Sequence, residues 1–165
     1  MKKIIILLFL ILPLGLFAQD AKIAIVRVAE ITPALPEFVS MQNQLEELNQ
    51  MYEKELKQMQ DEYTNKYTSY VEQQETLTEN IKIRRMQEIE QIRERIDNFL
   101  QAASQDVQQK QQDLYAPIQQ KVFDAINSVG SEKGYTYILV PEALLYVGAN
   151  AIDATPFVKS KLGLQ

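Results

Sequence analysis

The side chains of this chain that are able to do chemistry are carboxylates and amines spaced one helical turn apart. Glu53 precedes Lys57, and Asp106 precedes Lys110. At this spacing an acid and a base pair on one helical face, so neither is left in a pocket with the shifted pKa of a general acid or base. The sequence has no histidine, no cysteine and no glycine-rich phosphate loop. We therefore predict that the protein is not an enzyme and has no catalytic residues, no metal ligands and no cofactor.

One group of side chains has the character of a binding surface. Met59, Tyr63, Tyr67 and Tyr70 recur along one stretch of the chain. Tyrosine rings offer apolar contact with a polar edge, and methionine adapts to many shapes. We take these four residues as candidate contacts for a partner chain. The alternative is that they form the seam between two packed helices.

A basic cluster is the second candidate surface. Lys82, Arg84 and Arg85 are close together in the sequence, and they suit short-range contact with acidic partners or anionic lipid headgroups. The alternative is a solvated helix end in which these side chains pair with Glu75 and Glu79.

The elements that position both groups are long helices. Residues 37–116 contain no glycine and no proline, and apolar residues recur there at steps of three and four. Over residues 89–114 the average step is about 3.5, the spacing of a coiled-coil seam. Pro36 and Glu37 suit the first turn of a helix. The pattern predicts a coiled coil over residues 37–129, with a kink near Pro117.

Residues 76–80 predict a turn that folds this helical stretch into an antiparallel hairpin. They are poor helix formers, and Thr76 with Glu79 fits a capping box. Residues 41–80 hold nine acidic side chains against three lysines, whereas residues 81–95 hold five basic ones against three glutamates. Folding back lays the basic stretch beside the acidic one. Arms of this length reach about 60 Å.

Short strands at both ends of the chain predict a small β base. Residues 22–28 alternate β-branched and apolar side chains, and residues 135–140 and 143–147 predict two strands of a hairpin. A final helix follows Thr155 and Pro156. Three short strands make too little sheet to be stable alone, so we expect oligomerisation. The expected oligomer core consists of Ile23, Ile25, Val26, Tyr137, Leu139 and Leu145.

The N-terminus predicts export. Residues 1–18 combine two lysines, an apolar run from Ile4 to Leu12 and a small residue, Ala18, at the cleavage point of a signal peptide. The β base would then comprise residues 19–36 and 130–165. Without Lys2 and Lys3 the chain has 15 basic and 22 acidic residues, so nucleic acid is not an expected partner.

Several segments, taken in order, resemble the Skp/OmpH family of periplasmic chaperones. They are KIAIV at 22–26, the Gln- and Glu-rich helical stretch, LYAPIQQK at 114–121, Gly134 and Tyr135 leading into Ile138 and Leu139, the Leu145–Tyr146 pair, and IDAT at 152–155. The resemblance covers nearly the whole chain after the signal peptide.

The resemblance implies an α+β fold: a homotrimer with a β-barrel body and helical arms that hang from it as tentacles. It implies a periplasmic holdase of a Gram-negative bacterium, which binds unfolded outer-membrane proteins without ATP and prevents their aggregation in transit. This chain departs from basic family members in being acidic, which puts client capture by charge and any basic lipopolysaccharide site in doubt. The alternative function is a structural or adaptor coiled coil of the cell envelope.

Overall fold

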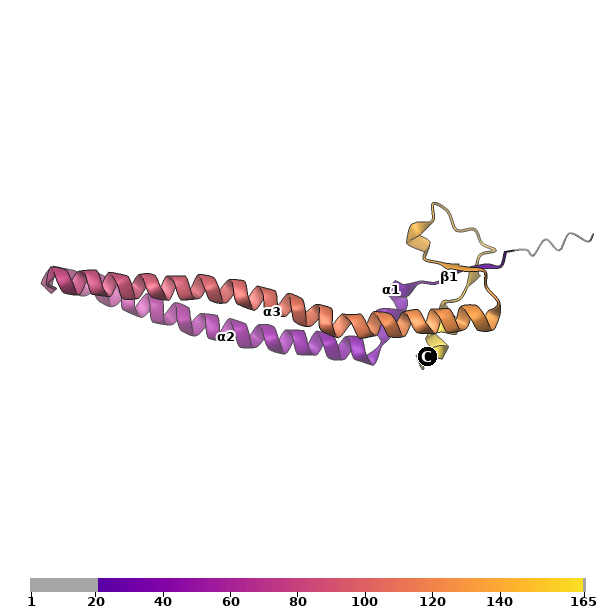
Figure 1. The fold of residues 1–165 in the computed structure, drawn as a ribbon, viewed down its shortest axis with the longest axis horizontal. Coiled ribbons are helices and arrows are strands. Elements are labelled where there is room, and N and C mark those ends of the chain that lie inside the picture. Colours follow the sequence, from indigo (N-terminus) through magenta and orange to yellow (C-terminus); the bar gives the residue numbers. More distant parts are fainter. Residues whose placement is uncertain (1–20, 165) are drawn as a thin grey trace, which may run out of the picture.

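The computed structural model describes residues 21–164 as a two-helix arm on a small base (Figure 1). The predicted signal peptide over residues 1–18 lies outside the described residues. The arm consists of α2 (Pro36–Gln73) and α3 (Glu79–Lys133), which run antiparallel and lie side by side in Figure 1. The predicted helical hairpin is therefore confirmed.

Two features of the sequence favour these helices: residues suited to the first helical turn, and apolar residues spaced three and four apart along one face. α2 begins at Pro36 with Glu37 in its first turn, as expected from the fixed φ of proline and the favourable end of the helix dipole. The predicted apolar positions lie on the facing sides of the helices. Of these, Met41, Ile89, Ile92 and Ala103 are buried in the seam.

The turn comprises residues 74–78 and so overlaps the predicted turn at residues 76–80, but the predicted capping box is wrong. The 3-10 helix η3 (Gln74–Thr76) follows α2, and Thr78 is the residue that precedes α3. The hydroxyl of Thr76 donates to the carbonyl of Gln73 at 2.8 Å, so it ends α2 and does not begin α3. Thr78 itself makes no side-chain capping bond.

The base contains a three-stranded sheet in the order β2-β1-β3. β1 (Ile23–Ile25) pairs in parallel with β2 (Tyr137–Leu139) on one edge and with β3 (Ile152–Asp153) on the other. Two further bonds extend these pairs: the amide of Val26 donates to the carbonyl of Leu139, and the amide of Ala154 donates to the carbonyl of Ile25. The two ends of the described chain therefore meet in one sheet, as predicted.

The predicted strand over residues 143–147 is wrong. The 3-10 helix η4 (Pro141–Ala143) and an irregular loop occupy this segment. Leu145 and Tyr146 are 110% and 83% exposed, so the described chain supplies no neighbouring strand for them. The sheet has no hairpin because both C-terminal strands reach β1 through long connections and pair with it in parallel.

The core of the base lies between the N-terminal segment, the end of α3 and the last helix, α4 (Thr155–Lys161). After β1, the chain turns through α1 (Val28–Ile31) and the 3-10 helix η2 (Thr32–Ala34) into α2. The largest fully buried side chains are those of Ile31, Leu35, Val26 and Val158. The last third of α3 packs on them through Ile118, Val122, Ala125 and Val129.

Two glycines allow α3 to approach and leave this core. A β-carbon at Gly130 would lie 3.3 Å from Cδ1 of Ile138, so the absence of a side chain lets α3 pack close to β2. Gly134 ends the helix with φ of 64°, a conformation that favours glycine. The amide of Tyr135 then donates to the carbonyl of Gly130 at 2.9 Å.

Pro117 lies inside α3, which runs through this position to Lys133 as one helix. Because proline lacks an N–H group, the carbonyl of Asp113 does not receive its helical hydrogen bond. The kink expected there stays a prediction. None of the helices in the described residues combines the length and apolar character that a membrane span requires.

A polar network joins Arg27, which lies between β1 and α1, to β3 and α4. The amide of Arg27 donates to the Thr155 hydroxyl at 2.9 Å, and the amide of Thr155 donates to Oδ1 of Asp153 at 2.9 Å. The Arg27 guanidinium also binds the Asp153 carboxylate. Burial alone would raise the pKa of the Asp153 carboxyl, but the hydrogen bonds from Thr155 and Arg27 outweigh it and hold that pKa below its usual value.

Ile31 tests the core of the base. Its side chain is fully buried, so Ile31→Ala should lower the free energy of unfolding by about 2–5 kcal/mol in urea titrations followed by circular dichroism. Ile83 is 50% exposed on the arm, so the same change there should cost no more than about 0.5 kcal/mol. Equal losses at the two positions would contradict the assignment of the core.

Asp153 should make the stability of the base depend on pH. Its pKa is lower in the folded than in the unfolded chain, so its contribution is present above the unfolded value and is lost as pH falls through the folded one. Asp153→Asn should therefore destabilise the protein at pH 7, and the difference from wild type should shrink below about pH 4. Urea midpoints at pH 7 and pH 3 measure this.

Asp97→Asn is the control for Asp153, because Asp97 is exposed on α3. It should leave the urea midpoint close to that of wild type at both pH values. A deficit of Asp153→Asn that stays constant with pH would show that the carboxylate charge plays no part.

Candidate functional site

The predicted site residues lie in two separate places. The oligomer candidates belong to the base, and the partner-contact candidates belong to the arm (Figure 1). Among the described residues, no group of three or more Asp or Glu side chains is arranged to hold a metal ion.

Of the residues predicted for the oligomer core, some are buried within the single chain and others are exposed on its surface. Ile25 and Val26 are 4% and 2% exposed, so the chain itself covers them and they offer little surface to another subunit. Ile23 and Tyr137 lie opposite each other in the sheet register and are 46% and 59% exposed. Leu145 is fully exposed, and Leu139 is half-buried.

Exposed apolar residues therefore gather around the sheet. Besides the predicted Ile23, Tyr137 and Leu145, Tyr146 is 83% exposed and Ile152 is 36% exposed. A concentration of exposed large apolar side chains is typical of a protein interface. The sequence contained a signal for Tyr146, since the Leu145–Tyr146 pair is one of the segments that carry the family resemblance.

The tyrosine and methionine candidates lie along the outer half of α2. Met59, Tyr63 and Tyr70 are half-buried, and Tyr67 is 46% exposed. The rings of Tyr63 and Tyr67 stack with centroids 6.1 Å apart. The half-buried members thus serve partly as seam residues, whereas Tyr67 presents much of its ring to solvent.

Tyr52 closes the seam nearer the middle of the arm. Its hydroxyl donates to Oδ2 of Asp106 at 2.6 Å, and its ring meets the ring of Phe99 edge-on at 5.7 Å. The hydrogen bond to Asp106 raises the pKa of Tyr52 because the carboxylate stabilises the protonated phenol. This contact holds the two helices in register.

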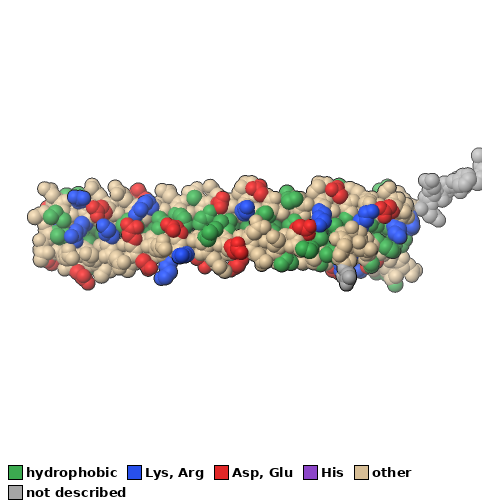
Figure 2. Space-filling model, turned by 90° about the horizontal axis from the view of Figure 1, so that it is seen from below, with side chains coloured by type: hydrophobic (Ala, Val, Ile, Leu, Met, Phe, Trp, Pro, Cys, Tyr) green, Lys and Arg blue, Asp and Glu red, His purple; other side chains and the backbone are tan. Residues whose placement is uncertain are grey.

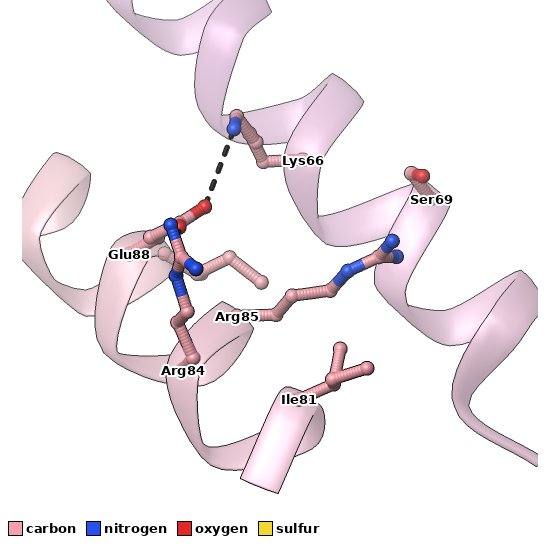
Figure 3. A pocket seen from close by; sticks show the side chains of 7 residues that line it. Lys66, Ser69, Ile81, Arg84, Arg85 and Glu88 are labelled. Atoms are coloured by element: carbon pink, nitrogen blue, oxygen red, sulfur yellow. Dashed lines mark hydrogen bonds and ion pairs between the residues drawn. The ribbon is translucent and has the colours of Figure 1, made fainter. Parts of the chain in front are cut away.

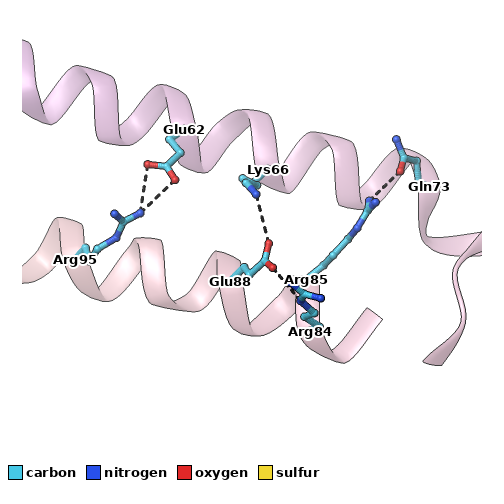
Figure 4. Close-up of polar contacts among 7 residues, drawn as sticks. All are labelled: Glu62, Lys66, Gln73, Arg84, Arg85, Glu88 and Arg95. Carbon is cyan, nitrogen blue, oxygen red and sulfur yellow. Dashed lines mark hydrogen bonds and ion pairs between the residues drawn. The ribbon is translucent and has the colours of Figure 1, made fainter. Parts of the chain in front are cut away.

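Two of the basic candidates and Lys66 border a shallow hollow of about 430 Å³ near the arm tip (Figure 3). Lys66 of α2 and Arg84 of α3 both reach the carboxylate of Glu88, each at 3.3 Å (Figures 3 and 4). Arg85 instead crosses to α2 and donates to the amide oxygen of Gln73 at 2.8 Å (Figure 4).

Lys82, the third basic candidate, forms an ion pair with a neighbouring glutamate, as in the alternative of a solvated helix end. The ammonium group of Lys82 lies 4.0 Å from the carboxylate of Glu79, within the first turn of α3. Glu75 takes no part in any ion pair of the described residues. The three basic side chains are therefore tied to their neighbours, and their role as contacts for a partner stays a prediction.

A second ion pair between α2 and α3 lies on the same flank of the arm as the pair of Lys66 with Glu88. Arg95 of α3 binds Glu62 of α2 through both carboxylate oxygens at 3.2 Å (Figure 4). Figure 2 shows hydrophobic side chains running along the arm between such charged ones, with several Lys and Arg side chains toward the tip.

Two ion pairs fasten other elements to α3. Lys121 binds Glu37 at the start of α2, and Lys161 of α4 binds Glu132. The hydrogen bonds from these lysines hold the pKa values of Glu37 and Glu132 below their usual range. Both carboxylates are solvated, so these pairs set position more than they add stability.

A groove that the sequence did not reveal runs along one flank of the arm, and we call it the flank groove. It consists of two hollows of about 410 and 400 Å³ that share Asn49 as a lining residue. Their other lining residues come from both helices: Tyr52, Glu53, Leu56, Phe99, Leu100, Ala103, Ser104, Val107 and Gln108 in one, and Phe38, Met41, Gln42, Leu45, Glu46, Gln111 and Tyr115 in the other.

Leu100 is the groove residue that a closer reading of the sequence would have found. It follows the seam residue Phe99 directly and so breaks the seam spacing, and 46% of its surface is exposed. An apolar residue one position off the seam must lie on a flank of the coiled coil.

Comparisons with known proteins support one family. The family model for OmpH-like outer membrane proteins matches residues 22–162. The chain is 29% identical over 134 residues to the chaperone protein Skp of Pectobacterium atrosepticum, which covers 81% of each chain. It is 30% identical over 128 residues to the chaperone protein Skp of Yersinia enterocolitica, which covers 78% of each chain.

The fold is shared with a solved structure. The crystal structure of an OmpH-like protein from Caulobacter crescentus CB15 superposes with a TM-score of 0.75. The match covers 86% of this chain and 83% of that one, at 14% sequence identity. The resemblance drawn from the order of strand, hairpin and C-terminal segments is thereby confirmed: this chain belongs to the OmpH-like family of outer membrane chaperones.

Proposed function

We propose that this protein is an ATP-independent holdase of the periplasm, which binds unfolded outer-membrane proteins and prevents their aggregation in transit. The arm is the observation that carries the proposal. It exposes large apolar side chains along its length, among them Leu100, Tyr67 and Met51, within a surface that is otherwise polar. Such a surface makes loose, replaceable contacts with many sequences.

The site candidates of the arm take part in this proposal. Met59, Tyr63, Tyr67 and Tyr70 contribute adaptable apolar contacts, and Lys82, Arg84 and Arg85 contribute positive charge at the tip. Transient contact of that tip with a membrane surface belongs to the same proposal. The relatives named as chaperones in two other bacteria support the function as a whole.

A homotrimer is the second part of the proposal. The sheet has three strands of two or three residues each, which is little structure to be stable alone. The exposed apolar side chains around it provide the surface for subunit contacts. Three arms hanging from one body would enclose a space in which an unfolded chain is kept apart from others.

The rival function is a structural or adaptor coiled coil that spans a fixed distance in the cell envelope. Ion pairs such as Glu62 with Arg95 favour a defined helix register and suit either function. Only the holdase requires the arm surface to bind unfolded chains.

Aggregation of a client separates the two functions. When a urea-unfolded β-barrel outer-membrane protein is diluted into buffer, near-stoichiometric amounts of the trimer should suppress its light scattering without nucleotide. Unchanged scattering at several-fold excess would exclude the holdase and favour the structural coiled coil.

Leu145 tests the assembly. Leu145→Lys places a charge on a fully exposed apolar side chain of the base, so it should disrupt subunit contacts and reduce the mass in solution to that of one chain. Light scattering coupled to gel filtration measures this mass. Ile83→Lys, the same kind of change on the arm, should leave the mass unaltered. A wild-type protein that is itself a monomer would contradict the proposal.

A further inference from the structure

The two flanks of the arm differ in chemistry. Phe99 points to α2, where its ring meets that of Tyr52, so its neighbours Asn98 and Leu100 lie to either side of the seam. Two consecutive steps along a helix turn the chain through about 200°, which places them on opposite flanks. Asn98 borders the flank with the Glu62–Arg95 pair, and Leu100 borders the flank groove.

The flank groove is apolar with a negative rim. Leu56, Phe99 and Leu100 lie among its apolar lining residues, and the charged residues that line it in the described chain are Glu46 and Glu53. Neither carboxylate belongs to an ion pair within the part of the chain that the structure describes. The pairing of Glu53 with Lys57 that the sequence predicted is therefore wrong, because Lys57 binds Asp61 instead. Glu46 accepts one side-chain hydrogen bond, from Nε2 of Gln50 at 2.9 Å. On the tip hollow, by contrast, Lys66, Arg84 and Arg85 outnumber Glu88.

The length of the flank groove suits a short extended segment. From Phe38 to Leu56 the groove follows eighteen helical steps of α2, or about 27 Å. An extended chain covers that distance with about eight residues. The strands of membrane β-barrels have about 9–11 residues with apolar side chains on one face, so one such strand spans the groove.

We propose that the flank groove binds extended polypeptide segments that carry apolar side chains on one face and lysine or arginine beside them. The apolar face lies on Leu56, Phe99 and Leu100, and the cationic side chains reach Glu46 and Glu53. Segments rich in aspartate or glutamate bind less well, because their charge repels the rim. This inference rests on the proposed holdase function and adds to it a selection of clients by charge.

Single cysteines provide clean probes, because the natural chain has none. Ser104→Cys places a fluorescent label in the flank groove, and Asn98→Cys places the same label on the opposite flank of α3. The ligands are two ten-residue peptides of alternating valine and threonine that differ only in carrying two lysines or two glutamates.

The lysine peptide should change the fluorescence of the label at 104 and not that of the label at 98. The glutamate peptide should bind more weakly. The double variant Glu46→Gln with Glu53→Gln should remove the preference, with a loss of about two- to fivefold for each carboxylate. Raising the salt concentration should weaken the preference in the same way.

Glu47→Gln with Glu55→Gln is the matched control. It removes the same charge from α2 at positions that line neither hollow, so the preference for the lysine peptide should remain. If both peptides bind wild type equally, if neither binds, or if the label at 98 responds as strongly as that at 104, the inference is wrong.

A label at 104 that becomes shielded without peptide as protein concentration rises would also overturn the inference, since a second copy of the chain would then occupy the groove. The aggregation assay with the outer-membrane protein distinguishes the two levels of the proposal. If the protein suppresses aggregation but no peptide changes the fluorescence of the label at 104, the holdase function stands and only peptide binding in the flank groove is refuted.

Discussion

The central strand β1 pairs with β2 on one edge and with β3 on the other, and each pair joins residues more than 100 positions apart in the sequence. The backbone groups on both edges of β1 therefore find partners only after the arm has folded back on itself. The turn at η3 brings α3 back to the base, where its last third covers Val26, Ile31 and Leu35. The arm and the base therefore cannot fold independently, because the strands of the small sheet pair only when the much larger helical hairpin has formed.

The arm itself is held together more loosely than the base. Its seam buries Met41, Ile89, Ile92 and Ala103, while most other seam side chains are half-buried. The ion pairs between the helices are exposed, and each contributes under about 1 kcal/mol. Weak seams leave side chains such as Tyr67 and Leu100 partly available on the surface. The loose packing of the seam thus leaves apolar side chains exposed on the arm, as the proposed holdase function requires.

The sequence predicted the hairpin because both of its signals, helical spacing and the poor helix formers at residues 76–80, act locally. The sequence predicted less about which side chains and strands contact one another across the fold. The charge asymmetry predicted only that the basic stretch of residues 81–95 lies beside the acidic stretch. The pair of Glu62 with Arg95 has that polarity, whereas the pair of Lys66 with Glu88 has the opposite one. Residues 143–147 have the composition of a strand, yet strand composition does not say whether a neighbour exists. The flank groove was missed because periodicity separates the seam from the surface but does not distinguish one flank from the other.

The unequal lengths of the helices have a mechanical consequence. α2 begins at Pro36, and beyond the ion pair of Glu37 with Lys121 α3 continues without it into the base. α3 thus runs as one helix from the arm tip to the hydrophobic core of the base, so a force applied at the tip is transmitted along this helix to the core. Pro117 lies within the last turn and a half of α3 that α2 still accompanies, and its missing hydrogen bond lowers the bending stiffness of α3 at that point.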